Sequence, residues 1–150
     1  MMELKSILLA EDSAKDVELT LEALGEHNLA NEVAVVQDGS EALDYLYRRG
    51  AYENREEGNP AVFLLDLKMP KVDGLTVLRT IKNDPALKTI PVVILTSSRE
   101  ERDVLEGYQL GLNAYVVKPV SFDQFVACVK QLGAFWAVIN ERPIGSTRRR

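Results

Sequence analysis

Four acidic residues and a lysine lie at, or just beyond, the ends of separate apolar segments: Glu11, Asp12, Asp66, Asp73 and Lys118. If these segments are strands of one parallel sheet, their carboxyl ends line a single crevice and the side chains converge there. Acidic groups crowded into one crevice repel each other unless a cation joins them. The residues therefore predict a divalent metal site, and a metal beside a carboxylate is typical of phosphoryl chemistry.

Magnesium is the cation that suits this set. It prefers oxygen ligands in octahedral geometry, and it usually takes one or two carboxylates together with waters and phosphate oxygens. Asp12 and Asp66 meet that description, with Glu11 binding directly or through a water. The alternative is that Glu11 and Asp12 only begin a loop and cap the first helix, where acidic side chains are favoured.

Asp66 is the best candidate for a reactive group, because it directly follows a continuously apolar segment of the central part of the sheet. A carboxylate can accept a phosphoryl group when a metal and cationic groups neutralise the phosphoryl oxygens. Lys118 can pair with Asp66 or with its phosphoryl group, and the hydroxyl of Thr96 can donate a hydrogen bond to a phosphoryl oxygen. Neither Lys118 nor Thr96 is strong evidence alone. Together with Asp66, each after its own strand, they indicate phosphoryl transfer to a carboxylate.

The elements that position these residues alternate between short apolar segments and amphipathic ones, five times. This pattern predicts a repeated βα unit and a parallel sheet covered by helices on both faces. The expected strands are 6–10, 32–36, 61–65, 91–95 and 114–117. The expected helices run from Ser13 to Gly25, from Asp38 to Gly50, over 75–83, over 99–110, and from Ser121 onward.

Two of these expectations concern details of helices. In the first helix, the apolar stripe is expected to consist of Ala14, Val17, Leu21 and Leu24. The last helix, if it runs to Asn140, extends beyond the sheet and carries an aromatic end that is either a dimer contact or a surface packed back on the domain.

The polar segment 51–59 is either a recognition surface or a tolerated insertion.

Length and composition indicate one domain, over 1–140, with a disordered tail over 141–150. Apolar residues make up 46% and charged residues 27%, as in soluble globular proteins. No apolar stretch is long enough for a membrane span and no secretory leader is visible, so we expect a cytoplasmic protein. Acidic residues outnumber basic ones, 23 to 18, and three of the basic ones are the terminal arginines, which argues against nucleic acid as a partner.

The single cysteine and the single histidine do not support other kinds of site. Cys128 cannot form an internal disulfide or a cysteine metal cluster, and it is expected to fill space in the last helix, either in the core or at the surface. His27 lies in a polar stretch and cannot make a ligand set alone. The arginine tail is either a weak electrostatic anchor or a solubilising end.

The ordered motifs resemble a receiver domain of bacterial two-component signalling, and in particular a stand-alone response regulator. The resemblance covers about 5–131 and rests on 7–12 (ILLAED), 64–70 (LLDLKMP), 73–74 (DG), 94–97 (ILTS) and 115–119 (YVVKP). It implies a flavodoxin-like, doubly wound (βα)5 fold, an α/β three-layer sandwich around a five-stranded parallel sheet.

The resemblance also implies a role for each site residue. Asp66 is the phosphoacceptor, and it receives the phosphoryl group from a histidine of a separate sensor kinase. Glu11 and Asp12 hold Mg²⁺ together with Asp66, and Lys68 adds its backbone carbonyl. Lys118 contacts the phosphoryl group. The chain would catalyse its own phosphotransfer and autodephosphorylation without a separate substrate, which makes it a switch and not an enzyme.

The same resemblance assigns the switching residues. Thr96 is the switch hydroxyl and Tyr115 the aromatic switch residue, and their movement alters partner binding through the face formed by the helix over 99–110, the fifth strand and the last helix. Lys68 and Ser98 occupy the two positions that tune the lifetime of the phosphoryl group. Asp73 matches a turn position and therefore leaves the site.

The long loop before the third strand and the aromatic end of the last helix further resemble one subgroup, the regulators served by phytochrome-type histidine kinases. This resemblance implies a phytochrome-type sensor kinase as partner and a homodimer formed through the region of the last helix. The downstream protein target is unknown.

Three other functions fit these residues less well. An aspartyl-phosphate hydrolase needs a second acid two residues after the nucleophile, where this chain has Lys68. A flavin carrier of the same architecture needs a phosphate-binding loop after the first strand, where Glu11 and Asp12 would repel a phosphate. A degenerate receiver acting as a protein scaffold is opposed by the complete set of site residues.

Overall fold

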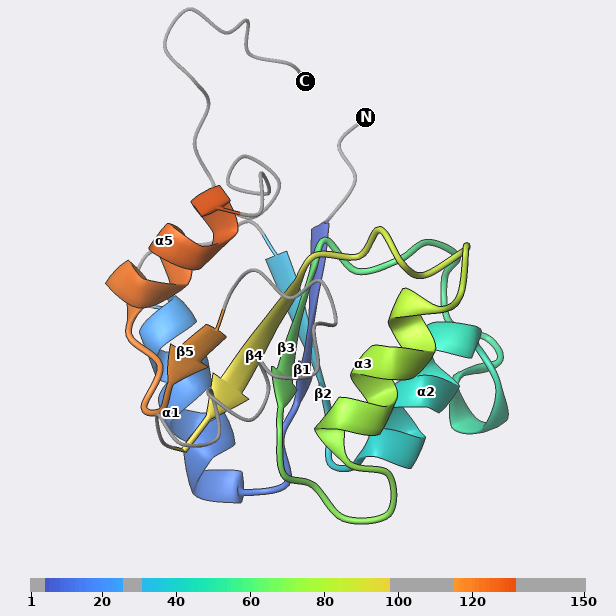
Figure 1. Cartoon of the computed structure of the whole chain (residues 1–150), viewed down its shortest axis with the longest axis horizontal. Helices are drawn as coiled ribbons and strands as arrows, with labels where there is room; N and C mark the ends of the chain where they lie inside the picture. Colours follow the sequence, from blue (N-terminus) through green and yellow to red (C-terminus); the bar gives the residue numbers. More distant parts are fainter. Residues whose placement is uncertain (1–4, 26–30, 98–114, 132–150) are drawn as a thin grey trace, which may run out of the picture.

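Five strands form one parallel sheet with the order β2-β1-β3-β4-β5 (Figure 1). The structure, a computed structural model, describes residues 5–25, 31–97 and 115–131. The strands are β1 Lys5–Ala10, β2 Asn31–Val36, β3 Val62–Asp66, β4 Val92–Thr96 and β5 Tyr115–Val117. The predicted α/β fold with a five-stranded parallel sheet is confirmed.

Helices cover both faces of this sheet. They are α1 Ala14–Gly25, α2 Gly39–Tyr47, α3 Gly74–Lys82 and α5 Phe122–Gln131, with a short 3-10 helix, η1, over Gly50–Tyr52. In Figure 1, α2 and α3 lie on one side of the sheet and α1 and α5 on the other. The helix expected over 99–110, the aromatic end of the last helix and the tail lie outside the described residues. None of the described helices has the length and apolarity that a membrane span requires.

The alternation of side chains along each strand divides the core between the two faces. Leu8, Phe63 and Leu65 pack with residues of α2 and α3, whereas Leu64 packs on the opposite face with Phe125 of α5. Every residue of β3 and β4 is buried, as expected for central strands between two helical layers. The sheet is therefore a rigid base for the residues at its carboxyl end.

The predicted apolar stripe of α1 is wrong in part. Thr20 and Leu24 are buried and Val17 is half-buried, but Ala14 is exposed and Leu21 is 37% exposed. The buried face thus follows positions 17, 20 and 24, at helical spacings of three and four. Thr20 was missed because it is polar by type, although at this position its side chain lies in the interior.

The predicted end of α2 is also wrong. The helix ends at Tyr47, and Arg48 takes the left-handed conformation with φ of 55° while its backbone N–H donates to the carbonyl oxygens of Asp44 and Tyr45. Gly50, also at positive φ, instead begins η1. A C-cap of this kind usually carries glycine, so an arginine there gave no signal in the sequence.

The segment 51–59 packs against α2. Arg55 Nε donates a 2.8 Å hydrogen bond to Tyr45 O, and its guanidinium carbon lies 4.2 Å from the centroid of the Tyr45 ring. The hydroxyl of Tyr52 donates to the carboxylate of Glu41. The insertion is therefore an ordered part of the domain, and its role in recognition stays a prediction.

Candidate functional site

The carboxyl ends of β1 and β3 bring three acidic side chains together. Glu11 follows β1, Asp66 is the last residue of the neighbouring β3, and Asp12 comes next after Glu11. One carboxylate oxygen of each of Glu11, Asp12 and Asp66 lies within 4.8 Å of the other two. Glu11 and Asp66 are buried and Asp12 is exposed, so the cluster opens to solvent on one side.

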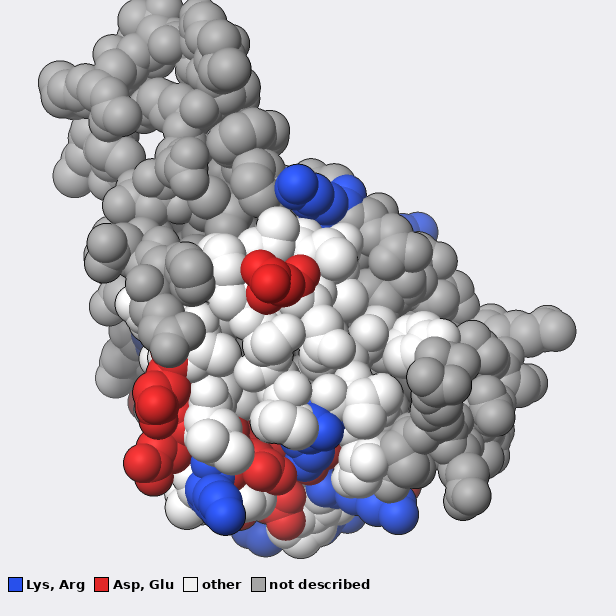
Figure 2. Space-filling model, turned by 90° about the vertical axis from the view of Figure 1, so that its left-hand side faces the viewer, with Lys and Arg blue, Asp and Glu red and all other residues white. Residues whose placement is uncertain are grey.

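Charged side chains gather at this end of the molecule. Figure 2 shows the side that carries α1 and α5, where acidic and basic residues concentrate toward the lower end and the described surface above is largely uncharged. The lower end is the one at which the strands finish in Figure 1.

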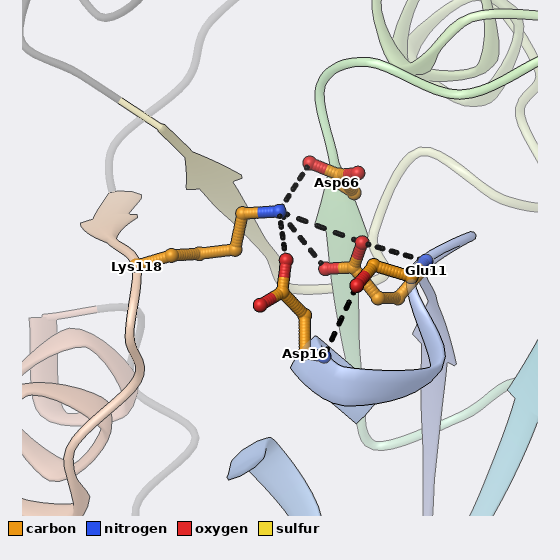
Figure 3. Close-up of polar contacts among 5 residues, drawn as sticks. Glu11, Asp16, Asp66 and Lys118 are labelled. Atoms are coloured by element: carbon orange, nitrogen blue, oxygen red, sulfur yellow. Dashed lines mark hydrogen bonds and ion pairs between the residues drawn. The ribbon is translucent and has the colours of Figure 1, made fainter. Parts of the chain in front are cut away.

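Lys118 reaches into the acidic cluster from the end of β5. Its Nζ lies 3.2 Å from Glu11 Oε1, 3.4 Å from Asp66 Oδ1 and 3.0 Å from Asp16 Oδ2 (Figure 3). The backbone N–H of Lys118 donates a 2.8 Å hydrogen bond to Thr96 O, which fixes the start of this side chain beside β4. One ammonium group thus bridges carboxylates from β1, β3 and α1.

Burial raises the pKa values of both buried acids. Burial, supported by the charge of Asp66 and opposed by Lys118, raises the pKa of Glu11 from 4.5 to about 7. Burial also raises the pKa of Asp66, against the lowering effect of Lys118. Burial alone would lower the pKa of Lys118, but Asp16, Asp66 and Glu11 together raise it. One lysine does not compensate for all these acids, so the site retains excess negative charge.

The donor set fits a divalent cation. Three carboxylate oxygens within 4.8 Å are the hard oxygen ligands that magnesium or manganese takes. The raised pKa of Glu11 shows that the crevice disfavours full ionisation without further positive charge. The cluster of Glu11, Asp12 and Asp66 could therefore hold a metal ion.

Thr96 is the last residue of β4, next to the strand that ends in Asp66. Its side chain is fully buried, and in the described part of the structure its Oγ1 has no hydrogen-bond partner. A buried hydroxyl without a partner costs free energy, roughly 1–3 kcal/mol, that a nearby ligand oxygen can recover. The position of Thr96 therefore suits a residue that gains a partner when the crevice is loaded.

Tyr115 and Lys68 are the remaining predicted site residues that the structure describes. Tyr115 begins β5, is half-buried, and packs against the core cluster beneath α2 and α3. Its carbonyl oxygen accepts a 3.6 Å hydrogen bond from the thiol of Cys128, which is buried in α5 and thus belongs to the core. Lys68 is exposed in the loop two residues after Asp66.

The loop after β3 is held close to Asp66 by its contact with α3. Asp73 caps this helix, because its Oδ1 accepts a 2.8 Å hydrogen bond from the backbone N–H of Thr76. Gly74 N donates to Leu67 O at 2.9 Å, and a Cβ on Gly74 would lie only 2.3 Å from Asp66 O. Asp73 is thus a cap outside the acidic cluster, and Gly74 permits the close approach of α3 to the backbone of Asp66.

The family model of the response regulator receiver domain matches residues 7–130. The chain belongs to this family. Receiver domains act in two-component signalling, and their general function is phosphorylation-dependent switching. The predicted family is therefore confirmed, over a segment that contains all the site residues discussed above.

This receiver is similar to solved response regulators associated with bacteriophytochromes. It is 60% identical to the bacteriophytochrome response regulator AtBRR, with a TM-score of 0.89, over 93% of this chain and 100% of that one. It is 62% identical to the bacteriophytochrome response regulator RtBRR, with a TM-score of 0.86, over 96% of this chain and 87% of that one. The Mn²⁺-bound form of response regulator Rcp1, a protein of Synechocystis sp., is 41% identical with a TM-score of 0.70, over 89% and 94%. The predicted subgroup is thus confirmed.

The structure brings most of the predicted site residues of this receiver together. Glu11, Asp12, Asp66 and Lys118 converge, and Thr96 lies at the end of the adjacent strand. The roles of all these residues, and of Tyr115 and Lys68, stay predictions. Ser98 and His27 lie outside the described residues.

Sequence reasoning missed Asp16, which makes an ion pair with Lys118. A usable signal was present. Because α1 starts directly after the crevice, an acid in its first turn lies close to the strand ends, and Ser13 at the cap marks where that turn begins.

Proposed function

We propose that this receiver accepts a phosphoryl group on Asp66 from a histidine of a separate sensor kinase. One observation carries the proposal: the ammonium of Lys118 lies 3.4 Å from the carboxylate of buried Asp66, in a crevice with two further acids. In the transfer, a bond forms between a carboxylate oxygen of Asp66 and phosphorus. The bond from phosphorus to the kinase histidine breaks, and its electron pair returns to the imidazole nitrogen.

The residues around Asp66 share the work of charge neutralisation. Glu11, Asp12 and Asp66 would hold Mg²⁺, with the backbone carbonyl of Lys68 as a further ligand. When bound, the cation supplies positive charge that neutralises phosphoryl oxygens. Lys118 is placed to exchange part of its contact with the acids for a contact with the phosphoryl group. The Mn²⁺-bound form of Rcp1 supports a divalent cation in this family.

Thr96 and Tyr115 would transmit the loading of the crevice. The buried hydroxyl of Thr96 can donate to a phosphoryl oxygen, which gives it the partner it does not have among the described residues. Tyr115 begins the neighbouring strand and would follow the movement of Thr96. The consequence is a changed equilibrium of the face formed by the helix expected over 99–110, β5 and α5, and therefore altered binding of a protein partner.

The relatives support a proposal for the upstream partner. AtBRR and RtBRR are both named as bacteriophytochrome response regulators, so we expect a phytochrome-type histidine kinase as phosphodonor for this receiver too, in the cytoplasm. An acidic chain favours a protein and not a nucleic acid as downstream target. We also propose that the receiver occupies 1–140, that the tail is disordered, and that copies pair through the region of the last helix.

The test is phosphorylation in the presence of Mg²⁺ with acetyl phosphate or a phosphorylated kinase, followed by intact mass. We expect one added phosphoryl group in the wild type and none in Asp66→Asn. Asp73→Asn is the matched control, because asparagine also caps helices well and Asp73 lies outside the acidic cluster. An unlabelled wild type, as a degenerate scaffold would give, refutes the proposal, and so does a labelled Asp66→Asn.

Dimer formation needs a separate measurement. The mass of the particle in solution is determined with and without beryllofluoride, which imitates a phosphoryl group on a carboxylate. A monomer in both states removes the homodimer from the proposal and leaves the phosphorylation site untouched.

A further inference from the structure

Asp16 is an additional carboxylate at the crevice, and it comes from the first turn of α1. Its Oδ2 lies 3.0 Å from Lys118 Nζ, closer than the oxygens of Glu11 and Asp66. Figure 3 shows the ammonium of Lys118 placed between Asp16, Glu11 and Asp66. Among the described residues, Asp16 therefore forms the shortest ion pair of this lysine.

Hydrogen bonds around Ser13 hold Asp16 in this position. Ser13 Oγ accepts a 3.2 Å hydrogen bond from the backbone N–H of Asp16, and the backbone N–H of Ser13 donates to Glu11 Oε2 at 3.4 Å. The first turn of α1 thus connects two of the carboxylates that contact Lys118. Negative charge in the first turn of a helix is also favoured by the helix dipole.

The three partners of Lys118 differ in what else they bind. Glu11 and Asp66 belong to the group of acids that could hold a metal ion, and Asp16 does not. With a cation and a phosphoryl group in the crevice, the carboxylate of Glu11 would bind the cation, and Asp66, bonded to phosphorus, would no longer be a free carboxylate. Asp16 would take part in neither contact, so its ion pair with Lys118 is the one that loading would leave in place.

We infer that Asp16 is a positioning residue, which holds the ammonium of Lys118 beside Asp66 while the phosphoryl group is transferred. The inference rests on the proposed function, in which Lys118 contacts that group. A lysine side chain is long and flexible, and fixing it beforehand reduces the entropy cost of arranging it during the transfer. Without Asp16 the ammonium turns toward solvent or toward one acid, so in fewer molecules does Lys118 lie beside Asp66 when the phosphoryl donor arrives.

The test compares the rates of phosphorylation by acetyl phosphate and Mg²⁺ in wild type, Asp16→Ala, Asp16→Asn and Glu18→Gln. Glu18 is an exposed acid on the same helix and serves as the matched control. We expect Asp16→Ala to be phosphorylated about threefold to tenfold more slowly, the effect of one partly exposed charged hydrogen bond. Asp16→Asn keeps an oxygen acceptor without the charge and is expected in between, and Glu18→Gln is expected to match the wild type.

A double-mutant cycle separates positioning from a general structural effect. If Asp16 acts through Lys118, the variant carrying both Asp16→Ala and Lys118→Met is phosphorylated no more slowly than Lys118→Met alone. The side-chain ammonium signal of Lys118 in nitrogen NMR is also expected to exchange faster with water in Asp16→Ala and to be unchanged in Glu18→Gln.

Three results would overturn the inference. The first is an Asp16→Ala protein that is phosphorylated at the wild-type rate or faster. The second is a loss of rate on adding Asp16→Ala to Lys118→Met that equals the loss in the wild-type background. The third is an ammonium signal of Lys118 that is unchanged in Asp16→Ala. The two proposals fail in different ways. A wild type that takes up no phosphoryl group refutes the proposed function itself, whereas a labelled wild type with an unaffected Asp16→Ala refutes only the role of Asp16.

Discussion

Replacing Glu11 with glutamine is expected to remove most of the pH dependence of stability that the crevice causes in the metal-free protein. In the folded protein the carboxyl of Glu11 keeps its proton up to about pH 7, whereas in the unfolded chain it loses the proton near 4.5. Between these values the folded state binds more protons than the unfolded state. The free energy of unfolding therefore falls as the pH rises from about 4.5 to about 7, and stays lowered above it.

The size of this effect follows from the two pKa values. The interval from 4.5 to about 7, at about 1.4 kcal/mol for each pKa unit, corresponds to a loss on the order of 3 kcal/mol. Glu11 is 1% exposed, so solvent screening reduces the figure little. For a chain of this length the loss lowers Tm by roughly 6–12 °C. Asp66, whose pKa is also raised, contributes in the same direction.

The assay is thermal unfolding in a chelator at about pH 5 and about pH 8, for wild type, Glu11→Gln and the control Glu18→Gln. The glutamine keeps the shape of the side chain but cannot ionise, so Glu11→Gln is expected to retain only the smaller dependence due to Asp66. Glu18→Gln should follow the wild type. Added Mg²⁺ should raise the Tm of the wild type more at the higher pH, where ionised acids bind it better.

Parallel pH profiles for wild type and Glu11→Gln would refute this reasoning, because they would mean that Glu11 ionises alike in the folded and unfolded states. A larger stabilisation by Mg²⁺ at the lower pH would refute the assignment of the acids as its ligands. The comparison uses the slope with pH and not the absolute stability, since Glu11→Gln also removes a charged partner of Lys118.

Two further predictions concern the residues that support Asp66. Thr96→Val should leave the free energy of unfolding in urea unchanged or raise it by up to about 1 kcal/mol, because it removes a buried hydroxyl without a partner among the described residues. In this variant, phosphorylation should no longer alter partner binding. A loss of stability above about 2 kcal/mol would contradict this account. Gly74→Ala should destabilise the domain by roughly 1–3 kcal/mol and slow phosphorylation, because its Cβ would press on Asp66 O. Gly25→Ala is the control, because a Cβ on Gly25 meets nothing within 4 Å. Equal stabilities of these two alanine variants in urea would show that α3 yields to the added methyl group.

The convergence of Glu11, Asp12, Asp66 and Lys118 could be predicted because it depends on few assumptions. Apolar segments fix where the strands end, and the rule for parallel sheets brings those ends to one edge. No side-chain conformation enters the reasoning. The same holds for β3, in which 62–65 are all apolar and indicate a central strand by that character alone, and all five residues are buried.

The features that were missed depend on tertiary contacts. Asp16 contacts Lys118 across 102 positions of sequence; its place in the first turn of α1 puts it near the strand ends, but the residues around it do not indicate which group it meets there. Arg55 lies over Tyr45 because the segment 51–59 folds back on α2. The polar composition of the segment does not predict this conformation. The apolar stripe predicted for α1 does not include Thr20, which is polar by type and yet is 1% exposed.

The distance between Glu11 and Lys118 in the sequence has a consequence during protein synthesis. The two residues are 107 positions apart, and the ribosome adds residues from the amino terminus at about 5–20 per second. Until the segment of β5 has emerged, the nascent chain carries the acids of the crevice without the lysine that offsets their charge. A phosphodonor that meets such a chain finds an unfinished acceptor, so we expect the receiver to accept a phosphoryl group only after the segment of β5 has been synthesised.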